Sequence, residues 1–214
     1  MAAHTSPATV PRMEWTGDKA ADALIASNPL ALLIGFCLDQ QIPVEKAFMG
    51  PLVMKERLGT LDAQKLARMD PGRFEEAFRE RPAIHRFPAS MAARVQALCA
   101  LVAGEYGNDA TRIWAGVADA AELRRRLEAL PGFGQMKARI VLGVLAKHLE
   151  VRPAGWEALI PDHPTLADVR TVAERQEYQA GKRAWKAALR AQAQSTAAPA
   201  ASRATGTGRS RARG

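Results

Sequence analysis

A glycine turn that runs into an apolar helix is the stretch of this sequence best suited to chemistry. It reads LPGFGQMKARIVLGVL over residues 130–145. Gly132 and Gly134 permit positive φ and a close approach by another backbone, because glycine has no Cβ. The amides of Gly134 and Gln135 then begin the helix, where unpaired N–H groups and the helix dipole attract an anion. The stretch therefore predicts a turn that holds a phosphate of a nucleic-acid backbone.

Two basic residues, Lys137 and Arg139, follow the turn within its helix. They can add charge-assisted contacts to the same phosphate. They can equally be solvated residues of a helix surface. In that second interpretation the glycines serve the packing of two helices and bind nothing.

The charge balance also favours a polyanionic partner. The 214 residues carry a formal net charge of +8, and clustered Lys and Arg are rewarded when they neutralise phosphates. Part of the excess lies in SRATGTGRSRARG at residues 202–214, which contains four arginines and no acid. A stretch of this composition cannot form a core, so it is interpreted as a flexible basic tail. The tail either tethers nucleic acid loosely or only aids solubility.

Nearly every patterned segment has helical spacing, so an all-α fold is expected. Asp18 is expected to cap the first helix, and the apolar second helix to be central and buried. The predicted organisation is a flexible N-terminus at 1–17, a helical domain at 18–194 and a disordered basic tail at 195–214. The predicted helical segments are 18–28, 30–41, 42–59, 60–69, 70–80, 88–107, 119–130, 135–149 and 164–194.

The two cysteines and the apolar segments bear on the compartment. Cys37 and Cys99 lie inside apolar helical patterns, which predicts buried free thiols in a reducing cytoplasm. Neither has a Cys or His at ligand spacing, so no iron–sulfur cluster and no structural zinc is expected. No span reaches the roughly 20 apolar residues that cross a bilayer, and the N-terminus lacks an apolar signal-peptide core. A cytoplasmic, nucleoid-associated protein without a membrane partner is expected.

Two motifs together resemble a known family. LPGFG before an apolar helix, with LLIGFCLDQQ upstream at 32–41, resembles the helix–hairpin–helix superfamily of base-excision DNA glycosylases, the endonuclease III and 3-methyladenine glycosylase group. The similarity extends from about residue 30 to 154, and HRFPASMAARVQALC at 85–99 is most similar to an actinobacterial branch. The resemblance implies a monomer of two helical lobes, with a DNA-binding hairpin and a base pocket in the cleft between the lobes. It also implies base flipping in double-stranded DNA, since a stacked base cannot be attacked.

The resemblance assigns roles to individual residues. Gln41 falls where many members place a glutamine that fills the gap left by a flipped base, although a polar helix end is the alternative. Gln40 would line the base pocket with Trp156, whose ring can stack on a base or pack in the core. No cofactor is required, but the hairpin carbonyls of Leu130 and Gly132 can bind a monovalent cation that bridges to a phosphate. The implied DNA-binding residues are Gln41, Leu130, Gly132, Phe133, Gly134, Gln135, Lys137 and Arg139.

The catalytic lysine of bifunctional members has no counterpart in register. Its position is occupied by Met136, and Lys137 lies one residue beyond. One residue turns a helix by about 100°, so Lys137 is not expected to point where that lysine points. Schiff-base lyase chemistry is therefore not expected. The expected reaction is monofunctional hydrolysis.

A monofunctional glycosylase needs a carboxylate to stabilise an oxocarbenium-like transition state and to activate water. The family's aspartate falls on Ala154 or Gly155 in gapless register. Three other residues are candidates: Asp162 and Glu157 from the loop after the hairpin helix, and Asp39 from across the cleft. A loop carboxylate can also be merely solvated or cap a helix.

Three functions fit these observations. The first is a monofunctional DNA glycosylase that hydrolyses the N-glycosidic bond of a flipped damaged base. The second is a catalytically inactive protein that binds duplex DNA or lesions on the same fold. The third is a structural helical protein with a basic tail, which leaves LPGFGQMKARI unexplained.

Overall fold

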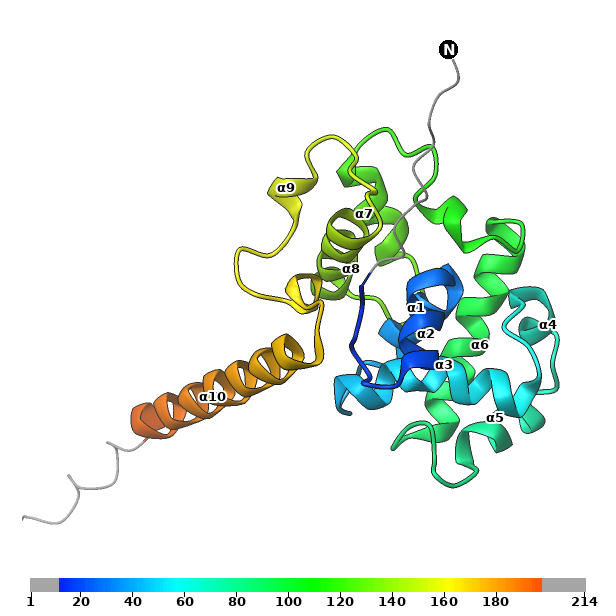
Figure 1. Cartoon of the computed structure of the whole chain (residues 1–214), viewed down its shortest axis with the longest axis horizontal. Coiled ribbons are helices and arrows are strands. Elements are labelled where there is room, and N and C mark those ends of the chain that lie inside the picture. The colour runs from blue at the N-terminus through cyan, green and yellow to red at the C-terminus, as the bar shows by residue number, and fades with distance from the viewer. Residues whose placement is uncertain (1–11, 198–214) are drawn as a thin grey trace, which may run out of the picture. The chain divides into compact units, whose positions relative to one another are not determined.

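The computed structural model describes residues 12–197, and these residues are helical with no strand. The predicted all-α class is therefore confirmed for this part of the chain (Figure 1). The chain divides into two units after Arg175. The helices are α1 Lys19–Ser27, α2 Pro29–Leu38, α3 Val44–Leu58, α4 Ala63–Ala67, α5 Pro71–Arg79, α6 Pro88–Glu105, α7 Ala120–Glu128, α8 Gln135–His148, α9 Trp156–Leu159 and α10 Val172–Ala197, with 3-10 turns η1 Ala110–Ile113 and η2 Leu166–Asp168.

Local capping chemistry sets most helix ends where the sequence predicts them. The Asp18 carboxylate accepts hydrogen bonds from the first amides of α1. Asn28 ends α1 and caps α2, whose first residue is Pro29. Asp70 caps α5 ahead of Pro71 in the same way. These ends are predictable because a cap contacts only amides two or three residues away.

The start of α4 differs from the expectation that a helix begins at Thr60. The cap is Asp62, whose carboxylate accepts from the Lys65 N–H. The Thr60 hydroxyl instead accepts from the Asp62 N–H, so it orders the turn that precedes the cap. Asp is the stronger N-cap of the two, which agrees with the position of the cap at Asp62.

Helix α2 is the centre of the core, as its apolar sequence predicts. All of its residues except Pro29 are buried, and α1, α3 and α6 pack around it. Phe36 meets Phe48 and Trp15 edge to face, with ring centroids 5.0 Å and 6.0 Å apart. Gly35 lets α3 approach, because a Cβ there would lie 2.4 Å from the Phe48 ring. A helix that is surrounded on all sides must be apolar on all sides.

The segment just before α1 packs onto the core. This differs from the prediction of a flexible N-terminus over residues 1–17. Met13 and Trp15 are buried. The Trp15 indole N–H donates to the Val169 carbonyl at 2.7 Å, and Arg175 donates to the Trp15 carbonyl at 2.6 Å. The sequence hides this contact because the two apolar residues show no helical or strand period. Residues 1–11 of the predicted N-terminus, and 198–214 of the predicted tail, lie outside the described residues.

Both cysteines are buried free thiols, as predicted. Burial raises the pKa of Cys37 to about 11 and that of Cys99 to about 12. Within residues 12–197, no single helix has the length and apolarity to cross a membrane. Helices α1 and α2 reach that threshold only as a pair bent by 112°.

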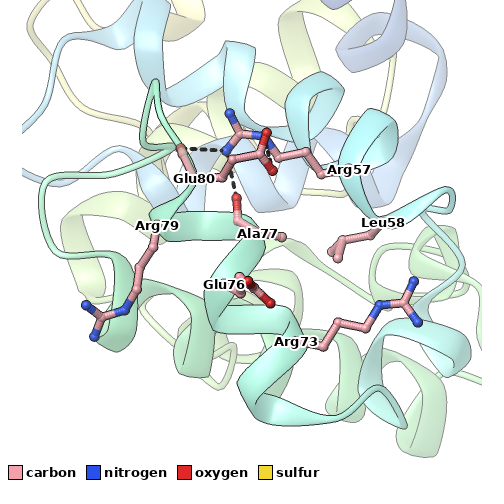
Figure 2. A pocket seen from close by; sticks show the side chains of 7 residues that line it. All are labelled: Arg57, Leu58, Arg73, Glu76, Ala77, Arg79 and Glu80. Carbon is pink, nitrogen blue, oxygen red and sulfur yellow. Dashed lines mark hydrogen bonds and ion pairs between the residues drawn. The ribbon is translucent and has the colours of Figure 1, made fainter.

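Arg57, near the end of α3, holds the end of α5 and the loop after it. Its guanidinium donates to the carbonyls of Ala77 at 2.7 Å, Glu80 at 3.0 Å and Pro82 at 3.1 Å. Figure 2 shows this group beside the Glu80 carboxylate, with Arg79 extending away from it. The surrounding hollow has a volume of about 570 Å³ and is lined by Arg57, Leu58, Arg73, Glu76, Ala77, Arg79 and Glu80.

We expect Arg57→Ala to destabilise the fold by about 2–4 kcal/mol, because the three carbonyls lose a charged donor. Urea denaturation followed by circular dichroism measures the change. Arg79→Ala is the matched control, since Arg79 pairs with Glu75 one turn away and is 60% exposed. The control should cost less than about 0.5 kcal/mol. Equal losses in the two variants would show that Arg57 has no special role.

Candidate functional site

The turn between α7 and α8, residues 129–134, is closed by its own backbone. The Phe133 N–H donates to the Leu130 carbonyl at 3.0 Å, and α8 begins after Gly134. No side chain caps α8, and Gly134, Gln135 and Met136 are exposed. The first amides of α8 thus lie at the surface with the positive end of the helix dipole. This geometry is able to hold an anion.

The two glycines of this turn have different structural requirements. Gly132 has φ +88°, and a Cβ there would lie 2.7 Å from Arg94 Cδ and 3.3 Å from Cys37 Sγ. Gly134 has φ −90°, and a Cβ there would meet nothing within 4 Å. Gly132 is therefore required by the packing of the turn against α2 and α6. Gly134 faces open space, where a ligand can approach.

We expect Gly132→Ala to destabilise the protein by about 2–4 kcal/mol, from left-handed backbone strain and the contact with Arg94. Gly134→Ala, the matched control two residues along, should cost less than about 1 kcal/mol. Urea denaturation of both variants measures the difference. A larger loss at Gly134 than at Gly132 would contradict this division of roles.

Lys137 reaches from the first turn of α8 to the end of α2. Its ammonium donates to the Phe36 carbonyl at 2.5 Å and lies 5.6 Å from the centre of the Phe133 ring. Burial lowers the pKa of Lys137, and the nearby negative charge of Asp39 opposes that shift. The lysine is thus held by a main-chain acceptor and faces inward. It links the start of α8 to the last turn of α2.

The residues that follow α2 are held by a polar network around Gln40. The Gln40 amide donates to the Cys37 carbonyl at 2.8 Å and accepts from Arg94 of α6, also at 2.8 Å. The Gln40 carbonyl is 2.9 Å from His85 Nε2. Because Gln40 contacts two distant segments as well as α2, the end of α2 has a defined conformation.

His85 is fully buried and fixed as one tautomer. The Phe87 N–H donates to its Nδ1 at 3.1 Å, so Nε2 carries the proton that is donated to Gln40. Burial is the main cause that lowers the pKa of His85. The ring therefore remains neutral and connects the loop before α6 to the end of α2.

Gln41 and Asp39 flank this network. Gln41 has φ +58° and an exposed side chain. A left-handed conformation costs a residue other than glycine about 1–3 kcal/mol, and it often accompanies function. The Asp39 N–H donates to the Gly35 carbonyl and ends α2, and its charge acts on Lys137. Of the three residues after α2, Asp39 is thus the one whose charge is shown to act on Lys137.

The other predicted residues lie on or beside α9, which packs against α7 and α8 (Figure 1). Arg139 donates to the carbonyls of Leu159 at 2.9 Å and Ile160 at 3.1 Å, so it binds the end of α9 to α8. Asp162 is fully exposed, and its hydrogen bond from His163 is the largest cause that lowers its pKa. Glu157 is exposed and Trp156 is half-buried at the start of α9. Of the three candidate carboxylates, Asp39 is the one whose charge acts on Lys137.

Arg94 is the member of this region that sequence reasoning missed. It contacts Gln40 and lies against Gly132, so it joins α6 to both the α2 end and the glycine turn. Its segment of sequence is a run of helical spacing with one basic residue, which gives no sign of a partner 54 positions away.

No family model, curated protein or solved structure matches the chain. The structure therefore defines the class as an all-helical protein over residues 12–197. Within that range, no group of three or more His, Cys, Asp or Glu side chains could hold a metal ion. The hollow of Figure 2 shares no lining residue with the α7–α8 turn or the end of α2.

Proposed function

We propose that the chain is a base-excision DNA glycosylase of the helix–hairpin–helix type. It hydrolyses the N-glycosidic bond of a flipped damaged base in duplex DNA and has no lyase step. The observation that supports this proposal best is the reach of Lys137 from the α8 start to the end of α2, where the charge of Asp39 acts on it. DNA held at the exposed amides of α8 would thereby meet a carboxylate and a glutamine.

In the proposed complex, each part has a separate task. The amides of Gln135 and its neighbours bind a phosphate, which positions the duplex without reading its sequence. Gln41, exposed and directly after Gln40, enters the space that the flipped base leaves. The carbonyls of Leu130 and Gly132 would hold a monovalent cation. The Leu130 carbonyl also accepts a hydrogen bond from the Phe133 N–H.

Asp39 supplies the chemistry in this proposal. Its carboxylate stabilises the positive charge that develops on the sugar and takes a proton from water. The water oxygen bonds to C1′, and the electrons of the broken C1′–N bond leave with the base, which takes a proton from solvent. The charges of Lys137 and Asp39 act on each other. Because its ammonium is held by the Phe36 carbonyl, Lys137 does not serve as nucleophile.

An excision assay tests this function. The purified full chain is incubated with duplexes that bear uracil, hypoxanthine, alkylated purines or oxidised purines, and each reaction is divided and treated with or without alkali. Strand scission only after alkali, on at least one lesion, is expected. Scission without alkali would make Lys137 a nucleophile and refute the monofunctional mechanism. Tight duplex binding without excision of any lesion would establish the alternative, a non-catalytic DNA-binding protein.

A further inference from the structure

The second unit of the chain contains a helix with an exposed aromatic residue. Helix α10 continues through this unit as far as Ala197. Trp185 is 63% exposed, although tryptophan is usually well buried. Among the side chains described from Gln176 to Gln192, Tyr178 and Gln179 are half-buried and the others are exposed. This unit therefore presents a helix surface to solvent rather than a core.

The same surface is basic. Between Gln176 and Ala197 the sequence has four basic residues and a single acid, Glu177. The described basic side chains Lys182, Arg183 and Arg190 are exposed. The sequence that follows, 198–214, adds four arginines without an acid. The whole second unit thus has a large positive charge in a small length of chain.

Aromatic and basic residues alternate along one side of α10. Tyr178, Lys182 and Trp185 are spaced by four and three positions, so they share a helix face. The Lys182 ammonium lies 5.1 Å from the centre of the Tyr178 ring. A cationic stripe with interleaved aromatic rings suits a sugar–phosphate backbone, because cations release counterions from the phosphates and the rings offer broad apolar faces to the sugars.

We propose that α10 is a second contact surface for nucleic acid, which binds the sugar–phosphate backbone of duplex DNA. The choice of duplex DNA rests on the proposed function. Two other partners fit the surface less well. A membrane-surface helix needs a broad face of large apolar residues, whereas alanine accounts for most apolar positions between Gln176 and Ala197. A second copy of the helix would bring like charges together.

Binding of the full chain to an undamaged duplex tests this inference. Fluorescence anisotropy of a labelled 30-base-pair duplex is measured between 50 and 200 mM salt for wild type and a charge-reversed variant, Lys182→Glu/Arg183→Glu/Arg190→Glu. The matched control is Lys65→Glu/Arg68→Glu/Arg73→Glu, which changes the same charge at exposed positions in α4, just after it and in α5. The α10 variant should bind at least about fivefold more weakly, and its log–log salt slope should fall by about 2. The change in net charge alone weakens binding to some extent. The loss of affinity in the control should exceed that extent by less than about twofold.

Trp185 provides an independent readout. Trp185→Ala should weaken binding by about threefold or more without changing the salt slope, because the apolar contact of the ring with the deoxyribose groups is lost and no charge is, whereas Trp185→Phe should retain most of the affinity. Equal losses in the α10 variant and its control would overturn the proposal. So would a tryptophan fluorescence blue shift on phosphatidylserine vesicles that Trp185→Phe abolishes, combined with unchanged DNA affinity in the α10 variant. This assay uses undamaged DNA and measures no excision. A negative result would therefore refute the role of α10 without refuting the glycosylase proposal, which the excision assay tests.

Discussion

Asp39→Asn should lower the single-turnover excision rate by about 10²–10⁴-fold while the affinity for duplex DNA changes by less than about threefold. The amide has the shape of the carboxylate, but it can neither take a proton from water nor stabilise a developing positive charge. The fold should persist, because Asp39 ends α2 through its main-chain N–H to Gly35. The measurement is excision of the preferred lesion with protein in excess, together with anisotropy on the same duplex.

The other two candidate carboxylates provide matched controls. Asp162→Asn and Glu157→Gln change exposed side chains on or after α9, and each should leave the excision rate within about twofold. A loss confined to Asp162→Asn would transfer the catalytic role to the loop after α9 and refute the assignment of Asp39. Urea denaturation of each variant separates a chemical effect from a loss of stability.

Several helix starts of this protein could be predicted because their chemistry is local. Asp18, Asn28 and Asp70 each satisfy amides of their own helix. The four-residue helix α9 could not be predicted inside its proline-rich segment, since four residues show no hydrophobic period. It matters for the site because Arg139 binds its last carbonyls. The expectation of Arg139 as a DNA contact stays a prediction, with two of its donors already used by the protein.

The candidate site was only partly predictable, because its contacts join segments far apart in sequence. The sequence marks Asp39, Gln40 and Gln41 as polar residues after an apolar helix. It does not show that Gln40 is held by Arg94 and His85, which lie on or before α6. It also treats both turn glycines alike. The tertiary neighbours alone show that one is needed for packing while the other faces open space.

That difference allows the turn to be tested without damage to the fold. We expect Gly134→Asp to lower duplex affinity by about 10- to 100-fold, because a carboxylate at the α8 start repels the phosphate and occupies its amides. The same substitution should stabilise the protein by about 0.5 kcal/mol, since aspartate caps a helix and favours its positive end. The open space around Gly134 and its φ of −90° accommodate the new side chain. Anisotropy and urea denaturation measure the two effects.

The control for this substitution is Gly134→Ser, which also caps α8 but adds no charge. Its stability should rise by a similar few tenths of a kcal/mol, and its affinity should fall by less than about threefold. Undiminished binding by Gly134→Asp would exclude the turn as the phosphate site. We expect the stability of Gly134→Asp to rise and its DNA affinity to fall. This combination is informative because a damaged fold would lower both. A variant that is more stable and binds DNA less well has lost a contact, and the contact lies at the start of α8.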